Sequence, residues 1–171
     1  MTAQRLLALL GERALTLAAA ESLTGGLVAD RLVSVPGASA VFRGGIVSYA
    51  TELKHVLLGV DAALLERSGA VHADVAGQMA EGVRRSCGAD VGISTTGVAG
   101  PDPQDGHAPG EVYLAVATAE GTRVRRVDLA GSRAEIRAAA VDAVLELAEE
   151  VVRSDSGAAG RPDAGRGLES E

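Results

Sequence analysis

The chain has 171 residues, of which 47% are hydrophobic and 2% aromatic, so its length fits one compact domain with an aliphatic core and a short extension. The net charge of −7 and the shortage of aromatic side chains argue against a protein that binds nucleic acid through a basic face. The single cysteine, Cys87, excludes an internal disulfide framework, and the three histidines lack the spacing of metal ligands, so we expect no metal site.

The N-terminal residues do not have the layout of a signal peptide, and no apolar run approaches the ~20 residues that a membrane span needs. We therefore expect a cytoplasmic protein that does not bind membranes.

Lys54 is the only lysine, and every other residue in the lysine-plus-arginine count is an arginine. A buried lysine can lose its proton and act as a base, whereas arginine stays charged.

Apolar periodicity and the positions of glycine and proline predict helices that alternate with strands. In chain order we expect a helix at Thr2–Arg13, a strand at Leu15–Ala19, a helix at Thr24–Val35, a strand at Gly45–Tyr49, helices at Thr51–Leu58, Asp61–Ser68 and Ala73–Cys87, a strand at Val91–Thr95, hairpin strands at Glu111–Ala117 and Arg123–Leu129, and a helix at Ser132–Val152. The pattern predicts a layered α/β domain with a mixed β-sheet over residues 1–152. We expect residues 153–171 to be a disordered tail, and the loop Gly97–Gly110 is long enough to be functional.

The first candidate site is AESLTGG, Ala20–Gly26, between a strand and a helix. Such a turn directs backbone N–H groups toward an anion, and Gly25 and Gly26 let a ligand approach the backbone. Ser22 could be a nucleophile, as in other strand–turn–helix sites. The alternative is that Ser22 or Thr24 only caps the helix.

The second candidate pairs Tyr49, at the end of a strand, with Lys54, about one turn into the next helix. A lysine base needs its pKa lowered from ~10.4 by roughly three units, about 4 kcal/mol, and the apolar run Val56–Leu58 could supply the desolvation. The alternative is a solvated surface lysine.

Two further stretches offer groups that bind anions. The stretch TTGVAGPD, Thr95–Asp102, places Thr96 and Gly97 at the end of a strand, where ligands gather in open α/β sheets. The alternative is a turn without a ligand, and the residue pattern fits both equally well. In GSRAEIR, Arg133 and Arg137 share a helix face and suit a phosphate. Ser132 and Glu135 form a capping box there, and the alternative for the arginines is two solvated side chains.

Together, AESLTGG, GGIVSYATELKHVLLGV, GAVHADVA, TTGVAGPD and GSRAEIR resemble the CinA C-terminal domain family, the nicotinamide mononucleotide (NMN) deamidases also called PncC. The resemblance extends from about Leu6 to Glu150, and to the stand-alone form without a further N-terminal domain. It implies a three-layer α/β/α sandwich and hydrolysis of the NMN carboxamide to nicotinate mononucleotide and ammonia in pyridine nucleotide salvage.

By position, the resemblance makes Ser22 the nucleophile and Lys54 the general base. Tyr49 and Thr96 match residues associated with the active site, and Arg133 and Arg137 fall near the nucleotide phosphate. Two positions depart from the family: Leu23 stands where Cys is frequent, and His72 where Ser is frequent.

The residues and the resemblance agree on a Ser–Lys amidohydrolase that needs no metal or other cofactor, with an oxyanion held by amides near Thr24–Gly26 or Gly97. The alternative is a non-catalytic nucleotide-binding module in a competence or DNA-damage response. We expect a homo-oligomer, with a dimer as the default.

Overall fold

The computed structural model describes residues 2–155. Its elements, in chain order, are α1 (Thr2–Glu12), β1 (Leu17–Glu21), α2 (Leu27–Val33), the short 3₁₀ helix η1 (Ala38–Ala40), β2 (Phe42–Val47), α3 (Thr51–Leu58), α4 (Ala62–Ser68), α5 (Ala73–Ser86), β3 (Val91–Gly97), β4 (Glu111–Ala117), β5 (Thr122–Asp128) and α6 (Arg133–Ser154).

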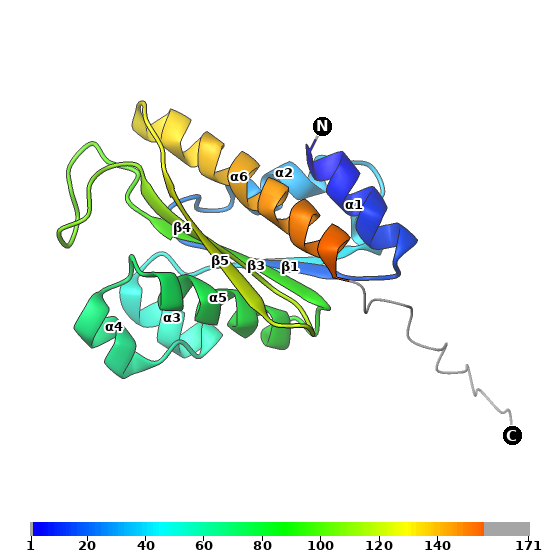
Figure 1. The fold of residues 1–171 in the computed structure, drawn as a ribbon, viewed down its shortest axis with the longest axis horizontal. Helices are drawn as coiled ribbons and strands as arrows, with labels where there is room; N and C mark the ends of the chain where they lie inside the picture. Colours follow the sequence, from blue (N-terminus) through cyan, green and yellow to red (C-terminus); the bar gives the residue numbers. More distant parts are fainter. Residues whose placement is uncertain (1, 156–171) are drawn as a thin grey trace, which may run out of the picture.

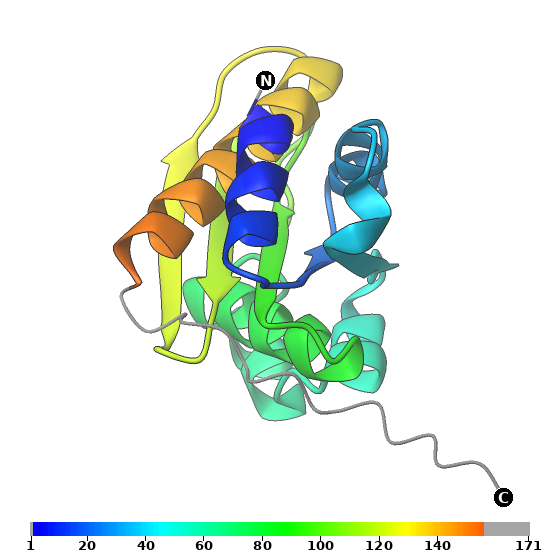
Figure 2. The ribbon, with the colours of Figure 1, turned by 90° about the vertical axis from the view of Figure 1, so that its right-hand side faces the viewer.

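The five strands form one sheet in the order β2-β1-β3-β4-β5. β2, β1 and β3 are parallel, whereas β4 and β5 are antiparallel to their neighbours. Helices α1, α2 and α6 cover one face of the sheet, and α3, α4 and α5 cover the other (Figures 1 and 2). This arrangement confirms the expected three-layer α/β/α sandwich with a mixed sheet.

Both faces of the sheet are packed with aliphatic side chains, as the shortage of aromatic residues requires. One core cluster joins β1, β3 and β4 to α1, α2 and α6, and it includes Leu6, Leu32 and Leu145. A second cluster lies on the opposite face and includes Leu58 and Met79. The central strands β1, β3 and β4 are therefore packed on both sides, whereas the edge strands β2 and β5 keep exposed residues.

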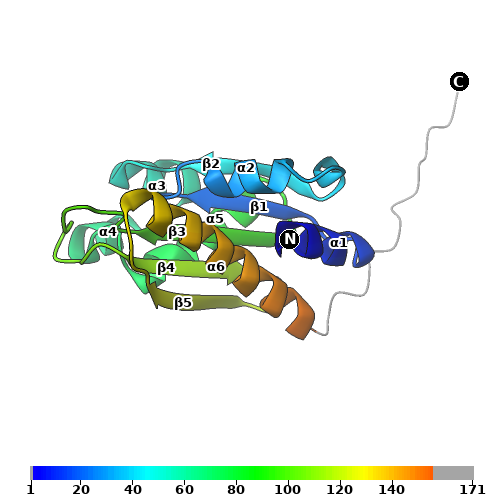
Figure 3. The same cartoon turned by 90° about the horizontal axis from the view of Figure 1, so that it is seen from above.

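The chain crosses between faces beside β1, and this crossing creates a place for a ligand. β1 connects to β2 through α2 on one face, whereas β2 connects to β3 through α3, α4 and α5 on the other. β1 and β3 therefore lie side by side with their carboxyl ends aligned, as Figure 3 shows along the middle of the sheet. In open α/β sheets, ligands bind outside the strand ends at such a switch point.

Three predicted boundaries near this point were wrong. β1 begins two residues later than expected, because Ala14 has φ 54° and the turn after α1 continues to Leu15. α2 begins three residues later than expected, because Gly25 and Gly26 have φ values of 57° and 99° and still belong to the turn. β2 begins three residues earlier than expected, because Phe42 already pairs with β1.

The other predicted helices and strands agree with the structure to within two residues at each end. Arg153 and Ser154, which were expected to begin the tail, are the last residues of α6, and residues 156–171 of the expected tail lie outside the described part. Among the helices of residues 2–155, none has the length and apolar character needed to cross a bilayer.

Candidate active site

A cavity of about 560 Å³, measured out to open solvent, lies at the carboxyl ends of β1 and β3. The cavity is lined by Ser22, Leu23, Tyr49, Thr51, Lys54, Ala70, Val71, Thr96, Gly97, Val98, Ala99, Gly100, Asp102, Gln104 and Arg133. Six residues singled out from the sequence therefore share one cavity: Ser22, Tyr49, Lys54, Thr96, Gly97 and Arg133.

Ser22 and Lys54 are in direct contact in this cavity. Lys54 Nζ lies 3.1 Å from Ser22 Oγ. Nζ also donates to the backbone carbonyls of Ser48, at 2.8 Å, and Tyr49, at 3.5 Å. Ser22 follows the last residue of β1, and Lys54 lies in the first half of α3, so two rigid elements set the distance between the two side chains.

The Lys54 amine is removed from water. The side chain is fully buried, and this burial lowers the pKa of Lys54 from 10.5 to about 8, although the negative charge of Glu52 opposes the shift. The expected source of desolvation was wrong in part, because Val56 and Leu57 are exposed and only Leu58 is buried. The helix turns these two side chains away from the pocket while Lys54 faces inward.

The turn after β1 is held by a residue that the sequence analysis missed. The Glu21 carboxylate is buried and accepts hydrogen bonds from the backbone N–H groups of Gly26, Val28 and Ala29, at 2.9–3.0 Å. It therefore caps α2 in place of a serine or threonine hydroxyl. An acidic residue directly before the turn was the available signal. The expected helix start at Thr24 was three residues too early, so the sequence analysis did not recognise Glu21 as the cap of α2.

Thr24 does not cap the helix and is absent from the cavity wall, so the structure does not place it among the ligand-contacting residues. Thr24 is fully buried, and its Oγ1 lies 2.8 Å from Thr95 Oγ1 on β3. Ser22 does not cap the helix either, since the N-cap position is Gly26 without a side-chain hydrogen bond. The capping alternative for Ser22 and Thr24 was therefore wrong.

The glycine amides and Arg137 serve the turn itself. Gly25 N–H donates to the Ser22 carbonyl, and Gly26 N–H to Glu21, so neither is free for a ligand. Arg137 donates to the carbonyls of Leu23 and Thr24 at 2.9 and 2.8 Å. Gly25, Gly26 and Arg137 do not line the cavity, which differs from their expected direct contact with a ligand. Arg137 instead braces the peptide groups that follow the nucleophile candidate.

Arg133 lies at the mouth of the cavity, in the first turn of α6. The predicted capping box of Ser132 and Glu135 is present and starts this helix. Arg133 donates to the Gly100 carbonyl at 2.8 Å and to the hydroxyl of Tyr49 at 2.9 Å. Two of its five N–H groups are used in these contacts with described residues, so others remain for an anion. The Tyr49 side chain is 58% exposed and also forms part of this rim.

Thr96 and Gly97 line the cavity from the end of β3. The Thr96 hydroxyl is buried and donates to the Ala70 carbonyl at 2.7 Å, so it holds the segment before α5 against the sheet. His72, the residue that departs from the family pattern, caps α5 through its Nδ1 and does not line the cavity. Leu23, the other departure, does line it.

Two polar cavity residues come from the loop between β3 and β4: Asp102, which was only part of a quoted motif, and Gln104, which was missed. The unusual length of this loop was the signal for them. Within residues 2–155, no three His, Cys, Asp or Glu side chains are grouped so that they could hold a metal ion.

Comparison with known proteins gives the family of the chain. A family model described as the CinA C-terminal domain matches residues 1–152. A CinA-like protein of Frankia casuarinae is 53% identical over 146 residues, which are 85% of this chain and 34% of that protein. A CinA-like protein of Geobacter sulfurreducens is 51% identical over 127 residues, 74% of this chain and 31% of that protein. The chain thus spans about a third of the length of these curated relatives.

Solved structures agree with this match. A CinA superfamily protein of Klebsiella pneumoniae has a TM-score of 0.86 at 29% identity, over 89% of this chain and 96% of that chain. The competence/damage inducible protein CihA of Agrobacterium tumefaciens has a TM-score of 0.84 at 33% identity, over 89% and 93% of the two chains. The protein therefore belongs to the CinA C-terminal domain family.

Proposed function

We propose that this protein hydrolyses the carboxamide of nicotinamide mononucleotide to the acid and ammonia, with Ser22 as nucleophile and Lys54 as general base. The observation that carries the proposal is the 3.1 Å separation between Ser22 Oγ and the fully buried Lys54 Nζ. A nucleophile and its base within hydrogen-bonding reach are the geometric signature of covalent catalysis. The family resemblance supports NMN as the substrate.

The neutral lysine has the right number of donors and acceptors for this role. An uncharged amine has two N–H groups and one lone pair. The two N–H groups face the carbonyls of Ser48 and Tyr49, so the lone pair can accept the Ser22 proton. With a pKa of about 8, about a quarter of Lys54 side chains are uncharged at pH 7.5, compared with roughly one in a thousand at a pKa of 10.5.

The reaction then follows in two steps. Ser22 Oγ attacks the carboxamide carbon while its proton moves to Lys54, and the C–N bond breaks as that proton passes to the leaving nitrogen, which releases ammonia. Water then attacks the Ser22 ester, with Lys54 again as the base, and releases nicotinate mononucleotide.

The backbone amide of Leu23, directly after Ser22, is the proposed oxyanion donor. Among residues 2–155, the N–H groups of Leu23 and Thr24 have no acceptor, in contrast to those of Gly25 and Gly26. Arg137 on α6 donates to the Leu23 carbonyl and so holds this part of the turn in place. Leu23 lines the cavity, so its amide can bind the oxygen that becomes negative during the attack, whereas Thr24 is fully buried.

The test is ammonia release from NMN by the wild type and by Ser22→Ala, Lys54→Met and Lys54→Arg. We expect each variant to lose at least about 10³-fold in kcat, since nucleophile and base act as one unit. The arginine variant is informative because it keeps a positive charge but cannot act as a base. Ser39→Ala removes an exposed hydroxyl outside the cavity and should retain wild-type kcat.

Each result separates the catalytic function from binding alone. Burst release of ammonia in the first turnover, followed by a slower steady rate, would support the ester intermediate. An active Ser22→Ala variant would contradict the nucleophile assignment. NMN binding to the wild type without turnover would favour the nucleotide-binding module.

A further inference from the structure

The loop between β3 and β4 forms one wall of the cavity. It leaves β3 at Gly97 and returns at Glu111, and Asp102 and Gln104 line the cavity from it. Its two ends are tied together, because Val98 N–H donates to the Glu111 carbonyl and Gly110 N–H donates to the Val98 carbonyl. Between these ends, Arg133 of α6 donates to the Gly100 carbonyl, while the outer part of the loop depends on contacts of its own.

The outer part of the loop is a small hairpin. Gln104 and His107 exchange two backbone hydrogen bonds, at 3.0 and 2.9 Å. The two residues between them, Asp105 and Gly106, have φ values of 51° and 83°, the left-handed conformations that a tight two-residue turn requires. The hairpin makes His107 and Gln104 move together, so whatever holds His107 also positions Gln104.

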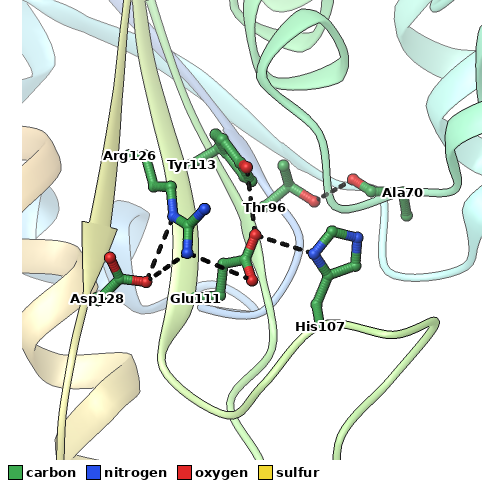
Figure 4. A network of polar contacts seen from close by, with 7 residues as sticks. All are labelled: Ala70, Thr96, His107, Glu111, Tyr113, Arg126 and Asp128. Carbon is green, nitrogen blue, oxygen red and sulfur yellow. Dashed lines mark hydrogen bonds and ion pairs between the residues drawn. The ribbon is translucent and has the colours of Figure 1, made fainter.

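His107 is held by a group of polar side chains at the start of β4. Its Nδ1 lies 2.9 Å from Glu111 Oε1, and Tyr113 donates to the same oxygen at 3.2 Å. Arg126 Nη2 lies 3.7 Å from Glu111 Oε2 and 2.9 Å from Asp128 Oδ1. Figure 4 shows these five residues, which we call the Glu111 network, between the loop and β5.

The sheet register explains how the Glu111 network is held. Glu111 lies opposite Asp128, and two carboxylates facing each other would repel, but Arg126 lies beside both and offsets the repulsion. Burial raises the pKa of Glu111, but the hydrogen bonds and charges of His107, Tyr113 and Arg126 outweigh it and keep this pKa below its usual value. The carboxylate is therefore a stable acceptor for His107.

The Glu111 network lies next to the cavity without entering it. Tyr113 pairs directly with Thr96, so both side chains stand on the same face of the sheet, and Thr96 lines the cavity. Figure 4 shows Thr96 beside Tyr113. None of His107, Glu111, Tyr113 or Arg126 lines the cavity or contacts Ser22 or Lys54 through the contacts described above.

We propose that Glu111, acting through His107, is a positioning residue that holds Gln104 and Asp102 in the cavity wall and thereby sets substrate affinity. The inference rests on the proposed amidase function. Contacts to a non-reacting part of a substrate act equally in the ground state and the transition state, so their loss raises KM and leaves kcat unchanged. A raised KM with an unchanged kcat would distinguish the role of Glu111 from that of Ser22 and Lys54, whose loss lowers kcat.

The experiment compares Glu111→Ala, His107→Ala and the double variant with the wild type, using NMN as substrate. We expect each single variant to raise KM about five- to tenfold with kcat within about twofold. The double variant should be no worse than the worse single variant, because both remove one shared interaction. Glu111→Gln keeps an acceptor for His107 and should recover most of the affinity.

The matched control is Glu150→Ala, which removes a carboxylate paired with another β5 arginine, Arg125, at 2.6 Å. Glu150 lies on α6, on the opposite face of the sheet from the Glu111 network, so its removal should leave KM unchanged. Amide hydrogen exchange of the ligand-free proteins gives a second measurement, in which residues 98–110 should exchange faster in both single variants and β3 should not change.

The outcomes for the inference and for the amidase function are distinct. Unchanged KM and unchanged loop exchange, or a fall in kcat without a rise in KM, would overturn the positioning role while the amidase stands. If the wild type releases no ammonia, the amidase fails, and calorimetric dissociation constants for NMN replace KM. Equal constants for the wild type and Glu111→Ala, or no binding at all, would then overturn the inference.

Discussion

At the scale of single residues, burial of the Lys54 amine in the candidate site lowers the free energy of unfolding near neutral pH. Burial of the amine lowers its pKa to about 8, while in the unfolded chain it stays near 10.5. Below pH 8 the lysine is mostly protonated in both states, and folding must desolvate a charge. Between pH 8 and 10.5 the unfolded state binds more protons, so stability rises with pH by up to about 3 kcal/mol.

Lys54→Met should therefore be inactive but more stable than the wild type near neutral pH. Methionine fills a similar space without a charge, although the carbonyls of Ser48 and Tyr49 lose their donor, at about 1 kcal/mol each. The net gain at pH 7 is about 1–2 kcal/mol, a Tm increase of a few degrees. Thermal unfolding followed by circular dichroism measures it.

The sign of the pH dependence tests the explanation. The advantage of Lys54→Met over the wild type should shrink as pH rises from 8 toward 10, since the native amine becomes neutral. Ser22→Ala keeps the amine and should follow the wild-type pH dependence. A gain for Lys54→Met that does not vary between pH 7 and 10 would rule out a buried charge as its cause.

The rate of NMN hydrolysis should depend on the protonation state of the Lys54 amine. Only the neutral amine can act as a base, so kcat/KM for NMN should rise with pH and level off above a pKa of about 8. A pH-rate profile from pH 6 to 10 measures this, at constant ionic strength. A flat profile across pH 8 would mean that Lys54 is not the base.

At the scale of elements, two glycines of α5 differ in whether a neighbouring backbone requires them to lack a side chain. A Cβ at Gly82 would overlap the backbone carbonyl of Leu58 at the end of α3, whereas a Cβ at Gly77 would meet only side-chain methyl groups, at 3.5 and 3.6 Å. Gly82 therefore lets α5 approach α3, the helix that carries Lys54, while Gly77 has no such role.

Gly82→Ala should destabilise the protein by at least about 2 kcal/mol, because a backbone carbonyl cannot move aside. It should also lower kcat, since α3 must shift. Gly77→Ala in the same helix should be neutral or stabilising by up to about 1 kcal/mol, through helix propensity. Urea unfolding measures both, and equal effects of the two changes would contradict the packing argument.

The same scale shows where prediction from sequence works and where it does not. The long helices and the β4–β5 hairpin were predicted within two residues, because their apolar periodicity and turn residues agree. β1 was misplaced because Leu15–Ala20 is apolar apart from Thr16 and offers no sustained alternation to set the register. Glu21 looked like a loop residue, since its three N–H partners come from a helix whose start was hidden by two glycines.

At the scale of the whole molecule, the cavity draws on all three layers. The sheet provides Ser22, α3 provides Lys54 from one face, and α6 provides Arg133 from the other. The sequence analysis assigned these three residues to one site, and all three line the cavity. They did not separate Arg133, which lines the cavity, from Arg137, which holds the turn, because both lie on one helix face and only the packing of α6 tells them apart.

The two arginines should therefore respond differently to substitution. Arg133→Ala should raise KM for NMN about tenfold or more with a smaller change in kcat, since it removes a cation from the rim. Arg137→Ala should lower kcat about tenfold or more with little change in KM, since it releases the peptides after Ser22. Steady-state kinetics of both variants distinguishes them, and a matching effect on KM would mean that Arg137 also contacts the substrate.

The carboxylate at the end of β1 has a consequence for how a phosphorylated ligand can lie. The positive end of α2 is already satisfied by an anion of the protein itself, so a phosphate gains nothing there and is repelled. The guanidinium of Arg133 offers the alternative, across the cavity mouth. A nucleotide would thus enter with its ring end first, and its charged end would stay outermost.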